Sequence, residues 1–118
     1  MPNRRMNKTI AGYHLLMILS AVDFRISSNE DMVIRDYLVH EFPFNVNLDK
    51  QMEVISRLRP EEWEGHFMKA MDDFYDDATE EERKNLIRFA IQLAKADNVI
   101  TKEENHYLNL LFEHWEAV

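Results

Sequence analysis

Glycine and proline are scarce in this chain, with two glycines and three prolines among 118 residues. Both residue types interrupt regular structure, so long stretches of the sequence lack the signals that mark turns. The alternation of apolar and polar residues that marks a half-buried strand is weak, whereas apolar residues recur at intervals of three and four. The sequence therefore predicts an all-α fold of six or seven helices.

The helical segments can be placed from their apolar spacing and their capping residues. The first, from about Lys8 to Val22, is apolar on nearly every face, which predicts a central and buried helix. Pro60 suits the first position of the fourth helix, and Thr79 with Glu82 forms a capping box for the fifth. The expected segments are 8–22, 28–42, 47–58, 60–78, 80–96 and 102–115.

The chain has the size of one typical domain, with 118 residues and a mass of 14.2 kDa. Its hydrophobic share of 46% and its charged share of 31% are those of a globular protein rather than a disordered segment. We expect residues 1–9 to be an N-terminal extension and residues 10–118 to form a single helical domain.

The composition excludes several kinds of chemistry. Cysteine is absent, which excludes disulfides, thiolate nucleophiles and cysteine-ligated zinc or iron–sulfur sites. Gly12 and Gly65 are the only glycines, so no glycine-rich loop can surround a phosphate, and the kinase, NTPase and Rossmann classes are excluded. No nucleophile, paired acid and base, or cofactor motif stands out. We therefore expect a non-enzymatic protein with no cofactor other than a possible divalent cation.

The formal net charge is -8, and the acidic excess lies in the second half of the chain. Residues 60–118 hold 15 Asp and Glu against 6 Lys and Arg, whereas residues 1–59 hold 7 against 8. This balance argues against nucleic acid as a partner. No segment approaches the roughly 20 apolar residues of a membrane span, so we expect no direct membrane insertion. The absence of cysteine fits a cytoplasmic protein.

A short pattern occurs twice, 74 residues apart, in segments 23–30 and 97–104. Both segments read Asp-x-x-Ile-(Ser/Thr)-x-x-Glu. The aspartate ends one helix, the isoleucine enters the core as the chain reverses, and the Ser/Thr and Glu cap the next helix. The repeat predicts duplicated helix-loop-helix units related by a pseudo-twofold axis, with Ile26 beside Ile100.

The segment 94–104 resembles the hallmark of the TerB-like helical family, named after the tellurite resistance protein TerB. That hallmark is Asp-Gly-x-Ile-(Ser/Thr/Asp)-x-x-Glu after an alanine-rich helix. Asn98 replaces the glycine, and in the looser first copy Phe24 stands there, which does not readily adopt the positive φ that glycine permits. The similarity extends over about residues 10–116. It implies a TerB-like domain and an accessory or scaffolding role in resistance to tellurite or other stresses, near a membrane complex, with acidic residues that bind metal.

The repeated turn also looks like the second half of an EF-hand loop, in which aspartate and glutamate are calcium ligands. In this interpretation a divalent cation would be held by Asp23, Glu30, Asp97 and Glu104. The positions of the earlier EF-hand ligands carry leucine, alanine or lysine, which leaves fewer than the roughly six to eight oxygens that calcium requires. The same four residues also fit a purely structural role as helix caps.

The densest charge in the sequence is the aspartate cluster, defined as Asp72, Asp73, Asp76 and Asp77. Carboxylates four residues apart on a helix repel each other, so an apolar stripe beneath them must hold the helix. The cluster could bind a hard cation or form a solvated face. The better functional interpretation is a binding surface for a basic protein partner.

His14 lies within the first apolar helix, where a hydrogen-bonded histidine is a better interpretation than a catalytic base. The residues and the resemblance together predict a non-enzymatic TerB-like accessory or scaffolding module. We expect it to bind a protein partner, in a membrane-associated complex. The alternative is a metal-ion-binding protein that uses the acidic loop or helix carboxylates. The sequence carries no signal for the oligomeric state.

Overall fold

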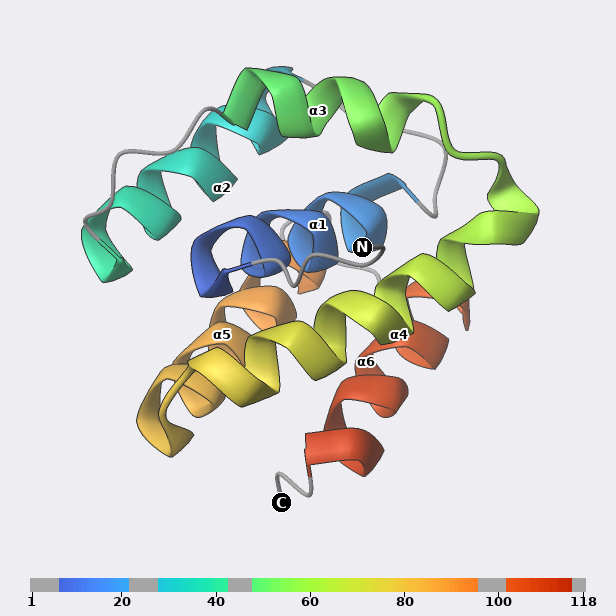
Figure 1. Ribbon diagram of the computed structural model, residues 1–118. Helices are drawn as coiled ribbons and strands as arrows, with labels where there is room; N and C mark the ends of the chain where they lie inside the picture. The colour runs from blue at the N-terminus through green and yellow to red at the C-terminus, as the bar shows by residue number, and fades with distance from the viewer. Residues whose placement is uncertain (1–6, 22–27, 43–47, 96–101, 116–118) are drawn as a thin grey trace, which may run out of the picture.

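The computed structural model describes residues 7–21, 28–42, 48–95 and 102–115. These residues form six α-helices and no strand, as predicted, and each helix ends within two residues of its expected bounds (Figure 1). The helices are α1 (Lys8–Ala21), α2 (Ser28–Glu41), α3 (Leu48–Ser56), α4 (Pro60–Asp77), α5 (Glu80–Lys95) and α6 (Lys102–Trp115).

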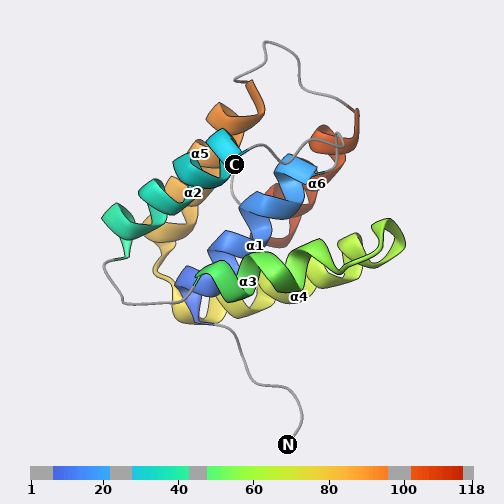
Figure 2. The same ribbon diagram turned by 90° about the horizontal axis from the view of Figure 1, so that it is seen from above.

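The central helix is α1, which packs against each of the other five. Figure 1 shows α2 and α3 on one side of α1, with α4, α5 and α6 on the other, and Figure 2 shows α1 still enclosed when seen from above. Every residue from Ala11 to Ser20 is buried. The expectation of a central helix is confirmed, because a helix surrounded by neighbours requires apolar side chains on all its faces.

Aromatic side chains join α4 to two other segments in the core. Phe74 of α4 is fully buried, and its ring meets that of Phe42 edge to face, with centroids 5.9 Å apart. On α6, the Trp115 ring stacks on Phe74 at 5.2 Å, and its indole N–H donates a 3.2 Å hydrogen bond to the Met71 carbonyl. Aromatic pairs contribute stability beyond the burial of their area. Phe74 therefore fixes α4 against α6 and the end of α2.

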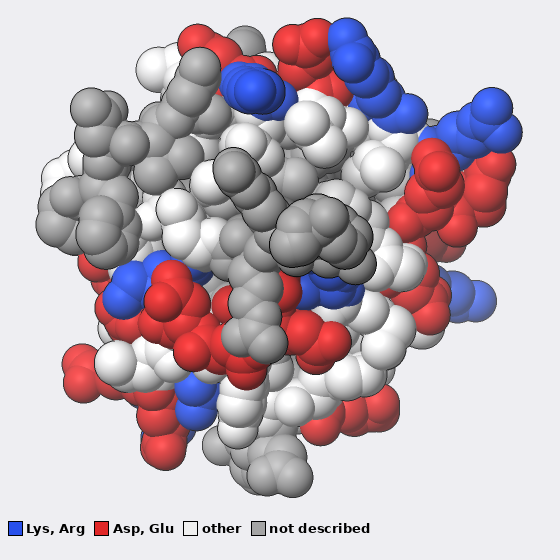
Figure 3. Space-filling model, viewed as in Figure 1, with Lys and Arg blue, Asp and Glu red and all other residues white. Residues whose placement is uncertain are grey.

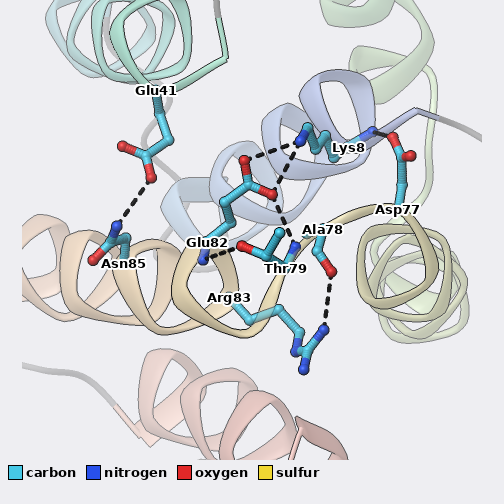
Figure 4. A network of polar contacts seen from close by, with 8 residues as sticks. All are labelled: Lys8, Glu41, Asp77, Ala78, Thr79, Glu82, Arg83 and Asn85. Atoms are coloured by element: carbon cyan, nitrogen blue, oxygen red, sulfur yellow. Dashed lines mark hydrogen bonds and ion pairs between the residues drawn. The ribbon is translucent and has the colours of Figure 1, made fainter.

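The start of α1 is held by the turn between α4 and α5 (Figure 4). Asp77 accepts a 2.9 Å hydrogen bond from the backbone N–H of Lys8, and Asn7 accepts one of 2.9 Å from the N–H of Ile10. The Lys8 ammonium lies 3.0 Å and 2.9 Å from the two carboxylate oxygens of Glu82. The hydrogen bonds to Asp77 and Asn7 supply partners for backbone N–H groups that have none within the first turn of a helix. We call Lys8, Asp77 and Glu82 the α1 clamp.

Thr79 and Glu82 form the predicted capping box (Figure 4). The Thr79 N–H donates to Glu82 at 2.9 Å, and the Glu82 N–H donates to the Thr79 hydroxyl at 3.1 Å. Burial opposes ionisation of Glu82, but the hydrogen bonds from Thr79 and Lys8 outweigh it and lower the pKa of the Glu82 carboxyl. The carboxylate is therefore ionised at neutral pH and pairs with Lys8. Pro60 is the first residue of α4, as expected.

The predicted duplication stays a prediction, because both repeated turns, 22–27 and 96–101, lie outside the described residues. Ile26 and Ile100, which are expected to meet, belong to these two turns. The first helices of the two units differ in their surroundings. Whereas α1 is buried along most of its length, α5 exposes Arg88 and Gln92. The difference arises because α1 occupies the centre and α5 the outside of the fold (Figure 1).

The extension expected over residues 1–9 is described only from Asn7 onward, and Lys8 and Thr9 already belong to α1. Thr9 is buried, so it already belongs to the packed part of the helical domain. Among the described helices, none combines the length and the apolar character needed to cross a membrane.

Candidate functional site

The aspartate cluster lies at the end of α4, beside the end of α6. Figure 3 shows acidic side chains at many points over the part of the surface where α4 and α5 lie. The two helix ends border a surface depression, which we call the acidic hollow. Its lining residues are Asp72, Asp73, Tyr75, Asp76, His114 and Trp115.

Asp72 and Asp76 are the exposed carboxylates of the acidic hollow. They lie four residues apart and therefore share one face of α4. The opposite face of the helix carries buried Phe67, Ala70 and Phe74, which form the apolar stripe expected beneath the charges. Burial of this stripe holds the helix against the repulsion between neighbouring carboxylates, which amounts to a few tenths of a kcal/mol per pair.

Asp73 belongs to the fold as well as to the hollow. It is only 7% exposed, and its carboxylate lies 2.8 Å from the ammonium group of Lys69, one turn earlier on α4. A buried carboxylate is stable only when its charge is paired or hydrogen-bonded. The sequence placed Asp73 with the other aspartates, but its burial separates it from the exposed pair.

Asp77 lies outside the hollow and belongs to the α1 clamp instead. The residue faces the first turn of α1 (Figure 4), a contact between positions 69 apart that no local sequence signal reveals. The structure therefore brings Asp72, Asp73 and Asp76 together at one hollow and directs Asp77 to another helix.

Replacing Asp77 by alanine is expected to lower the free energy of unfolding by about 1 kcal/mol, the usual loss when a capping side chain is removed. Urea unfolding followed by circular dichroism would measure the difference. The Asp72→Ala variant is the matched control, because Asp72 is exposed on the same helix and should change stability by less than about 0.5 kcal/mol. Equal stabilities of the two variants would contradict the capping role.

The rim of the acidic hollow contains an exposed aromatic ring. Tyr75 is 44% exposed, and the guanidinium group of Arg83 lies 4.0 Å from the centre of its ring. Arg83 also donates to the Ala78 carbonyl at 3.0 Å (Figure 4). This hydrogen bond holds the guanidinium over the Tyr75 ring. On α6, the Nδ1–H of His114 donates to the Leu110 carbonyl at 2.9 Å. The hollow thus combines carboxylates with aromatic surface, a composition suited to a cationic side chain.

The loop carboxylates proposed as metal ligands are only partly described. Asp23, Asp97 and the side chain of Glu30 lie outside the described residues. Glu104 is described near the start of α6, where it is 6% exposed. Within the described part of the chain, no group of three or more His, Asp or Glu side chains is arranged to hold a metal ion.

A partly buried polar chain, which the sequence did not predict, connects α1, α3 and α4. His14 of α1 is 2% exposed, and its Nδ1 lies 2.6 Å from Nε2 of His66 on α4. Its Nε2 lies 2.7 Å from the amide oxygen of Gln51 on α3. The expectation that His14 is a hydrogen-bonded core histidine is confirmed. Its partners were missed because they lie 37 and 52 positions away in the sequence.

The observed architecture is that of a small all-α domain wrapped around one central helix. The sequence model of the family described as tellurite resistance protein TerB matches residues 9–114. The chain therefore belongs to the TerB family, which confirms the resemblance carried by segment 94–104. Comparison with curated proteins and with solved structures gave no match.

Proposed function

We propose that this chain is a non-enzymatic accessory module of cytoplasmic stress resistance that binds a basic protein partner through the acidic hollow. The proposal rests chiefly on one observation, the exposed pair Asp72 and Asp76 beside Tyr75. Membership of the TerB family supports a connection with tellurite resistance. A membrane-associated complex as the place of action is an expectation from the family resemblance.

The partner should be basic because of the charge around the hollow. Between positions 69 and 83 the chain carries seven Asp and Glu residues against one arginine, Arg83, and one lysine, Lys69. That lysine already pairs with Asp73. An electrostatic field of one sign speeds the association of the protein with an oppositely charged partner and disfavours binding of partners with the same charge. A lysine or arginine of the partner would lie between Asp72 and Asp76.

The absence of catalysis is part of the same proposal. The obvious candidate for a general base is His14, but both of its ring nitrogens take part in hydrogen bonds inside the fold. A general base must reach a substrate proton directly or through one water molecule. The burial of His14 therefore supports a structural role rather than a catalytic one.

Charge reversal at the exposed pair provides the test. The Asp72→Lys/Asp76→Lys variant should lower affinity for the protein that co-purifies with the wild type by at least about tenfold, and the wild-type complex should weaken as salt rises. Affinity capture from the native cell would identify the protein, and titration calorimetry would measure its binding. Asp73 and Asp77 are unsuitable for this test, because their replacement would also disturb the fold.

The matched control is Asp36→Lys/Glu53→Lys, which changes the net charge by the same amount on exposed positions of α2 and α3. The control should retain wild-type affinity. If both double variants bind equally well, or if both are weakened equally, the acidic hollow is not the binding surface. Circular dichroism of both variants would verify that the helices are intact.

A further inference from the structure

The outward face of α2 carries most of the large apolar side chains that this protein exposes. Among the described residues five such side chains are exposed, and three of them, Met32, Val33 and Val39, belong to this helix. Met32 is 66% exposed and Val39 is 56% exposed. The helix packs chiefly against α1 and lies at the outside of the fold (Figure 1). Single apolar residues are common on protein surfaces, but several together on one face indicate a site of protein interaction.

These side chains border a surface hollow, which we call the α2 hollow. Its described lining residues are Met32, Val33, Arg35, Asp36 and Val39. Met32, Asp36 and Val39 follow one another at intervals of four and three residues, so they share one side of the helix. The α2 hollow has no lining residue in common with the acidic hollow, and it contains one charge of each sign.

The order of the lining residues is symmetric about one point of α2. The midpoint between Arg35 and Asp36 is also the midpoint between Met32 and Val39. A two-fold axis through this point would set two copies of α2 side by side and antiparallel. Each Met32 would then face Val39 of the second copy, and each Arg35 would face Asp36 of the second copy. Because every contact of such an interface occurs twice, one helix supplies two apolar contacts and two ion pairs.

The two charged groups are suited to this pairing. The Arg35 guanidinium is held by Asp49 of α3 at 2.6 Å, and the Arg35 side chain is 27% exposed. A guanidinium has five N–H donors and can bind more than one carboxylate, and one that is already held loses less side-chain entropy when it does so. The Asp36 carboxylate is exposed and lies 3.6 Å from His40, which is charged only when protonated.

We infer that a second copy of this chain occupies the α2 hollow and forms a two-fold dimer through antiparallel α2 helices. The charge distribution favours a second copy over a basic partner, because residues 1–59 are nearly neutral, with 8 Lys and Arg against 7 Asp and Glu. Two chains of net charge -8 repel each other, but this contact keeps their acidic halves apart, since α4, α5 and α6 lie on the other side of α1 (Figure 1).

The dimer should be weak and reversible. The 14 residues of α2 form a helix about 21 Å long. One pair of helices of this length buries less surface than the roughly 1,600 Å² of a standard protein interface. We therefore expect a dissociation constant of the order of 100 µM.

Sedimentation equilibrium between about 10 µM and 1 mM chain would measure the dimer, over a range chosen to include that constant. The Val39→Asp variant should weaken dimerisation by at least about tenfold, because it places a carboxylate against Met32 of the second copy. The matched control is Val54→Asp, the same substitution at an exposed valine of α3 outside the α2 hollow. This control should dimerise like the wild type, and circular dichroism would verify that both variants are helical.

Introduced cysteines test the antiparallel register, since the chain has none of its own. Under oxidation, a mixture of Met32→Cys and Val39→Cys chains should form the mixed disulfide at least about tenfold faster than either variant alone forms its own. Positions 32 and 39 meet across the two-fold axis, whereas the two copies of position 32 lie about 10 Å apart along the helices, too far for a disulfide. Mass spectrometry would identify the linkage.

Three results would overturn this inference. These are a wild type that stays monomeric at the highest concentration, equal dimerisation of Val39→Asp and Val54→Asp, and no preference for the mixed disulfide. A monomeric wild type whose Val39→Asp variant loses a protein captured from the native cell would assign the α2 hollow to that protein instead. The Asp36→Lys/Glu53→Lys variant should dimerise less but keep its affinity for the basic partner, because the two hollows share no lining residue. The dimer and the proposed function can therefore fail separately.

Discussion

Replacement of Phe74 by alanine is expected to lower the free energy of unfolding by about 4 kcal/mol, the middle of the range for a buried phenylalanine. The ring is fully buried, and it contacts Phe42 and Trp115 through two aromatic pairs. Its removal would leave a cavity between α4, α6 and the end of α2 that neighbouring rings cannot fill without leaving their own packing positions. Urea unfolding followed by circular dichroism at 222 nm would measure the loss.

The adjacent aromatic residue provides the control for this prediction. Tyr75 is 44% exposed, and its contact with Arg83 lies at the surface. The Tyr75→Ala variant should therefore lose less than about 1 kcal/mol. If both variants lose the same amount, Phe74 is not a central contact of the core. Fluorescence is a poor probe here, because Trp115 stacks directly on the substituted ring.

The second large effect is expected at Gly12, where three helices approach the backbone of α1. A β-carbon at this position would lie 3.2 Å from a methyl group of Leu38, 3.3 Å from one of Leu86 and 3.3 Å from the ring of Phe74. A larger side chain would have to displace α2, α4 and α5 together. We expect Gly12→Leu to lower the free energy of unfolding by about 3 kcal/mol, the upper part of the range for overpacking.

Gly65 is the natural control for Gly12, because it also lies within a helix. A β-carbon there would have no neighbour within 4 Å. The Gly65→Leu variant should raise the free energy of unfolding by about 0.5 to 1 kcal/mol, since a glycine inside a helix costs backbone entropy. Thermal and urea unfolding of both variants would compare the two positions. A neutral Gly12→Leu would show that the helices around α1 can separate without loss.

The predictions made above for Asp77 and for the exposed pair of aspartates distinguish two roles within the aspartate cluster. Asp73 and Asp77 support the fold, through Lys69 and through the start of α1. Asp72 and Asp76 are exposed, so their substitution should change binding more than stability. A binding experiment on the whole aspartate cluster would mix the two effects. The structure therefore separates exposed from structural acidic residues that the sequence presents as one group.

The sequence by itself determined the helices of this protein and their ends. The apolar spacing, Pro60 at the start of α4 and the box of Thr79 and Glu82 all predicted local structure correctly. These signals are reliable because each depends on residues within one or two turns of the same helix. The burial of α1 was also predictable, because a helix that is apolar on every face has to be enclosed.

Only the tertiary structure decided which polar residues meet. The contact between His14 and His66 spans 52 positions, and that between Lys8 and Asp77 spans 69. Both depend on how the helices cross, which is set by the packing of many side chains and not by any local pattern. The same packing brings the ends of α4 and α6 together at the acidic hollow. A residue's spacing along a helix predicts its face, but what that face meets depends on the packing of the whole chain.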